Sequence, residues 1–241
     1  MKRNLIIAAA AGLALIVVMG VAAYAYFFSG LRTSPPSLGL SSPPASSSPT
    51  NATTGLAATW KVTTGSLAGY RVQELFVGET SKHQAVARTA NVSGGLTVSG
   101  DASGYKVSDI TLTADVTSLH SVDQVAGRNV SQRDGVVTRQ LGTQQFPNAT
   151  FTAVTATVPA SVTSSPVDVT LPGKLTIHGV TKDITATAHA QVVGDKIEIA
   201  GTLMINMADY GVSPPRAPFV TVDPTATVEF DVFLAKPRST D

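Results

Sequence analysis

The sequence predicts an all-β protein, an antiparallel barrel of about eight strands, preceded by one apolar helix and a disordered linker. Three observations support this fold class. The chain after residue 58 is rich in Val and Thr, whose branched Cβ atoms favour strands. Several segments alternate apolar and polar residues with the period of two that is typical of strands. No long segment after residue 58 has apolar residues at helical spacing.

The N-terminal residues 5–28 form an apolar run of 24 residues without a charge. As a helix this run would be about 36 Å long, enough to cross a hydrocarbon core of about 30 Å. Lys2 and Arg3 precede it, which favours a cytoplasmic N-terminus with the rest of the chain outside. We therefore expect residues 1–28 to be a single-pass membrane anchor. The alternative is a signal sequence cleaved near Ala25, which would release a secreted protein.

Residues 29–58 contain five prolines, eight serines and one charge. Such a segment buries too little apolar surface to offset its ordering entropy, so we expect a disordered, extended spacer. A barrel domain over 59–236 and a short tail over 237–241 follow. All 16 acidic residues but only 14 of the 17 basic residues come after residue 58, so this part is slightly acidic. It therefore lacks the basic surface that nucleic-acid binding requires.

Alternation marks the individual strands. It is clearest over 109–116, 184–189 and 227–232, where one face is apolar and the other polar. Within the strand predicted at 197–207, Ile199 should face the interior and Glu198 the solvent. Further strands are predicted at 60–64, 70–76, 84–98, 105–107, 150–158 and 167–177.

Turns and one short helix complete the predicted domain. Gly194-Asp195 indicates a two-residue hairpin turn, and residues 99–104 a longer one. Residues 119–145 are the least strand-like and can hold a short helix. A barrel of this size has an interior that either side chains or one ligand can fill, and the residues alone leave both open.

Motifs for catalysis are absent, so we expect no enzyme and assign no catalytic, metal or cofactor site. The chain lacks a Gly-x-Ser-x-Gly elbow, a His-Glu-x-x-His motif and a P-loop. Without cysteine it has neither a disulfide framework nor thiolate metal ligands. The four histidines, His83, His120, His178 and His189, are interpreted as surface or hydrogen-bonded side chains, with His120 and His178 as the base candidates if the protein were an enzyme.

The adjacent charges Arg133 and Asp134 allow two interpretations. In the first, the two side chains hold different neighbours and pin the segment that leads to Phe146-Pro147. In the second, Arg133 lies at the mouth of a cavity and meets the polar head group of a ligand.

The order of several short motifs resembles the YceI-like family. The motifs are Trp60-Lys61-Val62, Arg133-Asp134, Phe146-Pro147-Asn148-Ala149-Thr150-Phe151, the run GKLTIHGVTK from Gly173 to Lys182, and Asp209-Tyr210-Gly211-Val212. The resemblance covers about 59–236. Many relatives carry a histidine shortly after the Arg-Asp pair, whereas Val136, Val137 and Thr138 stand here, so any polar role of that histidine is missing.

The resemblance implies a lipocalin-like barrel whose elongated apolar cavity binds a polyisoprenoid, such as a prenylated quinone, in a bacterial periplasmic or secreted protein. Each buried methylene contributes about 0.8 kcal/mol, so a prenyl chain can be held by shape and apolar area. The inward-facing residues expected to line such a cavity are Ile110, Leu112, Val116, Phe151, Leu175, Ile177, Ile197, Ile199, Leu203, Ile205, Val228 and Phe230.

We therefore expect a membrane-tethered module, outside the cytoplasm, that binds an isoprenoid lipid as ligand for carriage, storage or stress protection. The alternative is an envelope interaction or structural protein whose barrel is fully packed and takes no ligand. Ligand identity and oligomeric state stay open.

Overall fold

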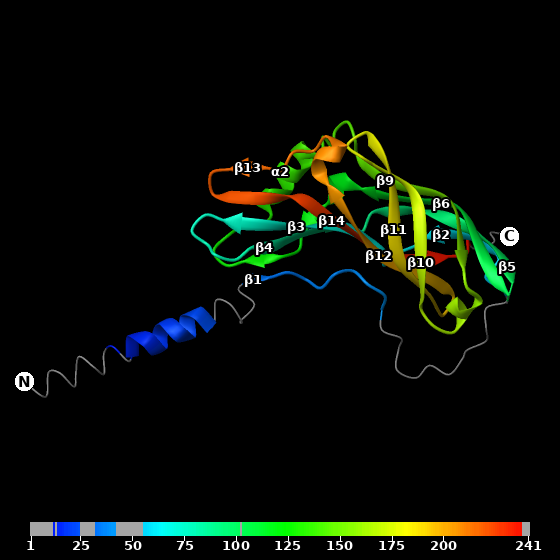
Figure 1. The fold of residues 1–241 in the computed structure, drawn as a ribbon, viewed down its shortest axis with the longest axis horizontal. Coiled ribbons are helices and arrows are strands. Elements are labelled where there is room, and N and C mark those ends of the chain that lie inside the picture. The colour runs from blue at the N-terminus through cyan, green and yellow to red at the C-terminus, as the bar shows by residue number, and fades with distance from the viewer. Residues whose placement is uncertain (1–11, 13, 25–31, 42–54, 102, 238–241) are drawn as a thin grey trace, which may run out of the picture.

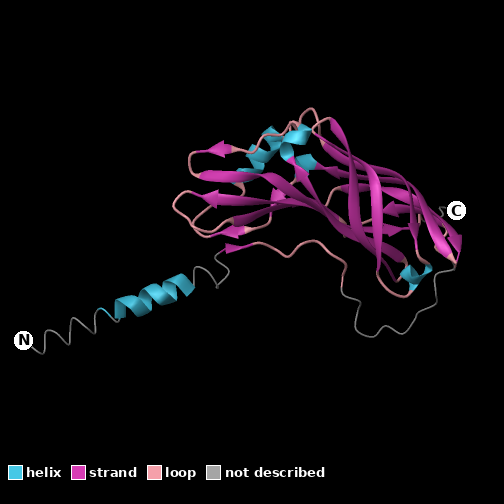
Figure 2. Ribbon diagram, in the orientation of Figure 1, coloured by secondary structure: helices cyan, strands magenta, loops and turns pink. Residues whose placement is uncertain are grey.

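The structure, a computed structural model, describes residues 12, 14–24, 32–41, 55–101 and 103–237. Its body is an antiparallel barrel, which confirms the predicted fold class (Figure 1; Figure 2). Eight strands form the ring in the spatial order β12, β11, β10, β9, β6, β5, β2 and β14, and β14 closes it by pairing with β12. These strands are β2 Ala58–Val62, β5 Val92–Asp101, β6 Gly104–Asp115, β9 Asn148–Val158, β10 Val167–Ile177, β11 Val180–Val193, β12 Lys196–Asn206 and β14 Val220–Ala235.

Further strands widen the barrel at one end. β3 (Leu67–Phe76) pairs with β14, β4 (His83–Thr89) pairs with β3, and β7 (His120–Ser121) pairs with β4. The helix α2 (Gln132–Gln140) and the 3-10 helix η3 (Met207–Tyr210) lie at this end (Figure 2). The other short elements are β1 Arg32–Thr33, which pairs with β8 Gln124–Val125, then β13 Arg216–Ala217, η1 Val116–Ser118 and η2 Ala160–Thr163.

The strands follow the predicted ranges with two differences. The predicted strand 84–98 is two strands, β4 and β5, joined by a turn. The predicted strands 105–107 and 109–116 are the single strand β6. Asp109, with a φ of 55°, lies at a bulge where the register of β6 against β5 shifts by one residue. That extra residue moves the buried side from Tyr105 and Val107 to Ile110, which explains why the alternation breaks there.

The β10–β11 hairpin turns at His178 and Gly179, both of which have positive φ, at 52° and 74°. A Cβ atom on Gly179 would lie 2.5 Å from the ring of Phe146, so a side chain has no room here. The Phe146 and His178 rings meet edge to face at 5.0 Å. The motif that begins at Phe146 and the motif that contains His178 and Gly179 are separated in the sequence, but they pack against each other in the fold.

One half of the barrel interior is solid. Trp60 is fully buried there, and its indole nitrogen donates to the Leu56 carbonyl at 2.9 Å. The surrounding core includes Leu96, Val107 and Leu171, together with alanines of β11 that let the sheets approach closely. Two smaller clusters, around Val72 and around Leu175, lie toward the widened end. Members of both smaller clusters border a cavity, so this end of the interior is not filled by side chains.

Residues 32–41 correct the expectation of a free spacer for that stretch. They run extended along the outside of the barrel, and we call them the N-terminal strap (Figure 1). The backbone N–H of Leu38 donates to Glu229 at 3.1 Å, and that of Ser41 donates to Glu198 at 2.7 Å. Proline stiffens this segment and lowers the entropy cost of docking it.

The N-terminal apolar run is described only in part. Helical structure covers residue 12 and residues 14–24, and the remainder of 1–28 lies outside the described residues. Within the described part of the chain, no helix combines the length and the apolar character needed to cross a membrane. The membrane anchor therefore stays a prediction from the sequence.

Candidate functional site

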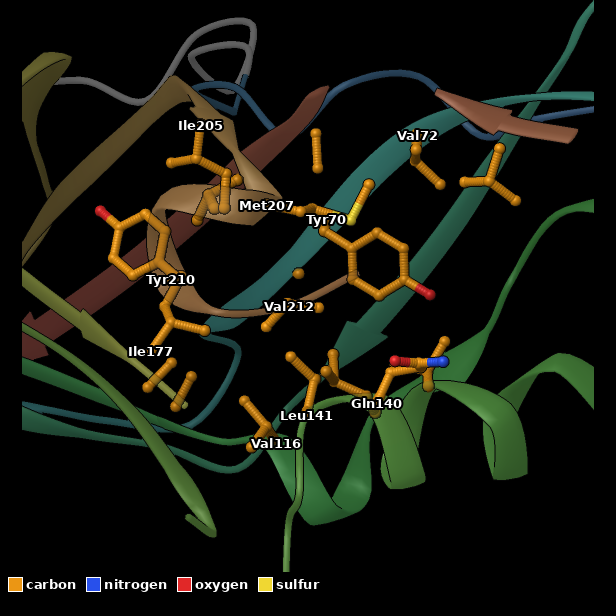
Figure 3. A pocket seen from close by; sticks show the side chains of 18 of the residues that line it. Tyr70, Val72, Val116, Gln140, Leu141, Ile177, Ile205, Met207, Tyr210 and Val212 are labelled. Atoms are coloured by element: carbon orange, nitrogen blue, oxygen red, sulfur yellow. The ribbon is translucent and has the colours of Figure 1, made fainter. Parts of the chain in front are cut away.

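An apolar cavity occupies the widened half of the barrel (Figure 3). Its volume is about 160 Å³, smaller than the roughly 300–1,000 Å³ that is usual for ligand pockets. Strands β3, β10, β12 and β14 form its walls, and α2 and η3 flank it. Its larger apolar lining residues are Val72, Val116, Leu119, Val137, Leu141, Leu175, Ile177, Ile205, Met207, Val212, Val222 and Val228.

Five of the twelve residues predicted to line a cavity do so, together with Arg133: Val116, Leu175, Ile177, Ile205 and Val228. The other seven belong to the solid core or pack against it: Ile110, Leu112, Phe151, Ile197, Ile199, Leu203 and Phe230. Alternation reports which side chains point inward, but it contains no information on whether the space in front of them is filled.

Several lining residues were not predicted because they do not lie on alternating strands. Met207 and Tyr210 come from η3, and Val137, Gln140 and Leu141 come from α2 or follow it. Figure 3 shows Leu141 and Met207 on opposite sides of the cavity. The sequence signal for α2 was only its lack of strand character, which predicts a short helix but not the face that it turns inward. The predicted short helix itself is confirmed.

Tyr70 supplies a polar group to this apolar cavity. Its ring lies in the cavity wall (Figure 3), and its buried hydroxyl has no hydrogen-bond partner among the residues that the structure describes. Burial raises the pKa of this hydroxyl well above its usual value, so it stays protonated and can donate. The amide of Gln140 lines the same cavity. A ligand oxygen that reached this wall would give the Tyr70 hydroxyl the partner that it lacks.

Arg133 lines the cavity but is held by carboxylates. Its Nη1 donates to Asp123 Oδ1 at 2.8 Å, and its Nη2 donates to Glu74 Oε2 at 3.0 Å. Asp123 also contacts His83 Nε2 at 2.7 Å and accepts from the Val86 N–H at 3.0 Å. Burial alone would raise the pKa of Asp123, but these hydrogen bonds and the Arg133 charge lower it. The network joins α2 to β3 and β4.

Asp134 fixes the same helix to Ser121, to which Arg133 Nη1 also donates at 3.3 Å. It accepts hydrogen bonds from the backbone N–H and the hydroxyl of Ser121 in β7, at 2.9 and 2.6 Å. The Arg-Asp pair thus pins α2, as the first interpretation of the sequence expects, but the two side chains share Ser121 as a neighbour. Because Arg133 also borders the cavity, the second interpretation stays a prediction, although two carboxylates already bind its guanidinium.

The histidines do not gather into a site. His83 is buried against Asp123, and His178 Nδ1 lies 3.2 Å from the carbonyl of Tyr210. His189 pairs with Asp168 on the surface at 2.6 Å, and His120 is exposed. In the described residues, no three His, Asp or Glu side chains come together in a way that could hold a metal ion.

An eight-stranded barrel with an apolar cavity flanked by a helix places the protein among β-barrels with an interior cavity. The model of the YceI-like domain family matches residues 60–234, and the chain therefore belongs to that family. This confirms the resemblance seen in the sequence. No curated protein is significantly similar to the chain.

Three solved structures are similar to the chain at low sequence identity, and the first of them shares its fold. A polyisoprenoid-binding domain from Saccharophagus degradans, implicated in plant cell wall breakdown, is 19% identical with a TM-score of 0.53, and the match covers 75% of this chain and 99% of that domain. BcnA from Burkholderia cenocepacia is 16% identical with a TM-score of 0.46, covering 69% and 95%. The YceI protein of Campylobacter jejuni is 18% identical with a TM-score of 0.39, covering 66% and 92%.

Proposed function

We propose that the protein binds one isoprenoid lipid, such as a prenylated quinone, with the prenyl chain inside the apolar cavity. The observation that carries this proposal is the cavity itself, whose exposed lining is mainly apolar. A prenyl chain inside the cavity needs no polar recognition along its length, because burial of each methylene contributes about 0.8 kcal/mol. The polyisoprenoid-binding domain of S. degradans, which has the same fold, supports this ligand class.

The polar wall suggests how the lipid is oriented. A head group with a carbonyl or hydroxyl oxygen would accept a hydrogen bond from the buried hydroxyl of Tyr70. A strongly anionic head group fits less well, because the guanidinium of Arg133 is already paired with Asp123 and Glu74. The proposed ligand therefore has a neutral head and a prenyl tail. Its binding would serve carriage, storage or protection against stress.

The same proposal places the barrel outside the cytoplasm, tethered to the membrane by residues 5–28. The length and apolar character of this run support the tether, and Lys2 and Arg3 support a cytoplasmic N-terminus. Carbonate extraction and protease protection of the full chain in its own host test the tether. Intact N-terminal sequence in the membrane fraction supports it, whereas a mature N-terminus close to Tyr26 would show a cleaved signal.

The test of lipid binding compares filled and unfilled cavities. The full chain is extracted from native membranes, and its bound lipids are identified by mass spectrometry. We expect a prenyl lipid with the unaltered protein and none with Ala149→Phe combined with Val228→Phe, because both side chains line the cavity and would occupy it.

Val154→Phe and Met204→Phe are the matched controls. Both positions are exposed on the outside of the barrel, so the larger side chain should leave lipid retention unchanged. Unaltered protein without lipid, or equal retention in the filled variant, would contradict the proposal and favour the packed-barrel alternative. Circular dichroism of both variants confirms that the barrel is intact.

A further inference from the structure

Two hairpins at the widened end of the barrel present apolar side chains to solvent. Val77 follows β3 and is 70% exposed, and Phe219 lies between β13 and β14 and is 57% exposed. The backbone N–H of Val77 donates to the carbonyl of Phe219 at 3.0 Å, so the two residues are neighbours. We call this pair the apolar tip. Figure 1 shows both hairpins projecting from the same end of the barrel.

The apolar tip adjoins the cavity. A groove beneath the β13–β14 hairpin is lined by Pro214, Ala217 and Pro218 among others. Ser213, Pro215 and Val222 line both this groove and the cavity. An apolar chain that entered at the tip would thus meet the cavity wall after passing a single hairpin.

The N-terminal strap brings the start of the chain to this end of the barrel. Arg32 and Thr33 pair with Val125 and Gln124, and the hydroxyl of Ser34 donates to the carbonyl of Gln84, near the start of β4. The apolar run of the sequence ends at residue 28. Four residues span at most about 14 Å. A bilayer that held residues 5–28 would therefore lie next to the widened end.

The charges around the tip suit a headgroup layer. The guanidinium of Arg128 lies 4.0 Å above the ring of Phe76, the residue before Val77. Lys82 and Asp223 neutralise each other at 2.7 Å. An exposed apolar pair, with an exposed arginine stacked on the residue that precedes Val77, is a composition that suits a bilayer interface.

We propose that the apolar tip is a membrane-contact surface, which inserts Val77 and Phe219 into the outer face of the bilayer that anchors the chain. This inference rests on the proposed tether. Insertion at this point lets a prenyl chain pass between the bilayer and the cavity along the groove, without crossing water. The partner is thus a lipid surface, and the contact serves loading and release.

The absence of cysteine makes this contact measurable site by site. The variants Val77→Cys and Phe219→Cys, each labelled with an environment-sensitive fluorophore, are reconstituted as full chains into phosphatidylcholine–phosphatidylglycerol vesicles. We expect blue-shifted emission at both positions and quenching by lipids brominated near the headgroups. Val154→Cys, which is 85% exposed on β9, is the control and should keep the emission seen in water.

Flotation of the same vesicles separates the two proposals. Protein that does not float with the vesicles overturns the tether and, with it, the apolar tip. Protein that floats while labels at 77 and 219 behave like the label at 154 overturns the apolar tip alone.

A second variant tests the role in lipid passage. Val77→Ser combined with Phe219→Ser changes no residue that lines the cavity. We expect transfer of a fluorescent prenyl lipid from donor vesicles to slow several-fold, with final loading and thermal stability unchanged. An unaltered transfer rate would overturn the role of the tip in loading.

Discussion

Tyr70 is the residue at which the chemistry of the cavity is most specific. Among the described residues its hydroxyl has no hydrogen-bond partner, and it is buried in a wall that is mostly apolar. An unsatisfied buried hydroxyl costs about 1–3 kcal/mol, so the empty protein is less stable than it would be with phenylalanine at this position. A ligand oxygen that accepts this hydrogen bond removes the cost. Tyr70 therefore couples ligand recognition to stability.

We expect Tyr70→Phe to stabilise the empty protein slightly and to weaken binding of prenyl lipids with an oxygen-bearing head about fivefold to tenfold, the value of one hydrogen bond. Binding of a polyisoprene hydrocarbon should not change. Fluorescence displacement titrations with both ligands measure the difference. Tyr105→Phe, at a buried tyrosine outside the cavity, is the control, and an equal loss for both ligands would mean that Tyr70 acts only through packing.

At the level of the elements, the N-terminal strap explains how two carboxylates can be buried on the outer face of the barrel. Glu198 and Glu229 point outward from β12 and β14, yet both are fully buried. The strap covers them and supplies donors, while Arg71 and Arg88 pair with Glu229 at 2.6 and 2.9 Å. The carbonyls of Pro35 and Pro36 accept from these arginines. Undocking of the strap would expose Glu198, Glu229 and the two arginines, which we call the charged seam. The docked strap and the charged seam therefore stabilise each other.

Asp231 makes this seam sensitive to pH. Burial, together with the neighbouring carboxylate of Glu198, raises the pKa of Asp231 to about 7. The folded protein thus holds this proton more tightly than the unfolded chain. The resulting stabilisation is complete below the unfolded pKa of about 4 and is lost as the pH rises through 7.

We expect the free energy of unfolding to fall between pH 5 and pH 8.5 by about 1 kcal/mol more in the unaltered protein than in Asp231→Asn, a value discounted for partial exposure. Urea unfolding at several pH values measures this difference. Asp195→Asn, in an exposed turn, should follow the unaltered protein. Parallel curves for the unaltered protein and Asp231→Asn would show that Asp231 has an ordinary pKa in the folded state.

At the scale of the whole molecule, the barrel is divided into a solid half and a hollow half. The solid half contains Trp60 and the largest cluster of buried apolar side chains. The hollow half is bounded by α2, η3 and the extra strands β3 and β4, which hold the walls apart. A ligand that binds in the hollow half of the folded barrel would add to its stability.

The division into a solid and a hollow half predicts that replacing isoleucine by alanine lowers the free energy of unfolding by different amounts in the two halves. Ile110→Ala, in the solid half, should cost about 3 kcal/mol because it leaves a new cavity in a packed core. Ile205→Ala should cost only about 1–2 kcal/mol, because its side chain already borders empty space. Urea unfolding of the lipid-free protein compares the two. Equal costs would indicate that the hollow half collapses when it is empty.

Alternation and ordered motifs are local signals, so the fold class, most strand positions and the family can be predicted from the amino-acid order. The inward faces of residues such as Ile177 and Ile205 follow from the same alternation. Which inward residues face empty space depends on how far α2 and η3 hold the walls apart, and this is a property of the folded molecule. Likewise, Glu198 points outward as its strand phase predicts, but it is buried because the strap, which is distant in sequence, lies over it. Burial and hollowness are properties of the assembled elements, and no local period encodes them.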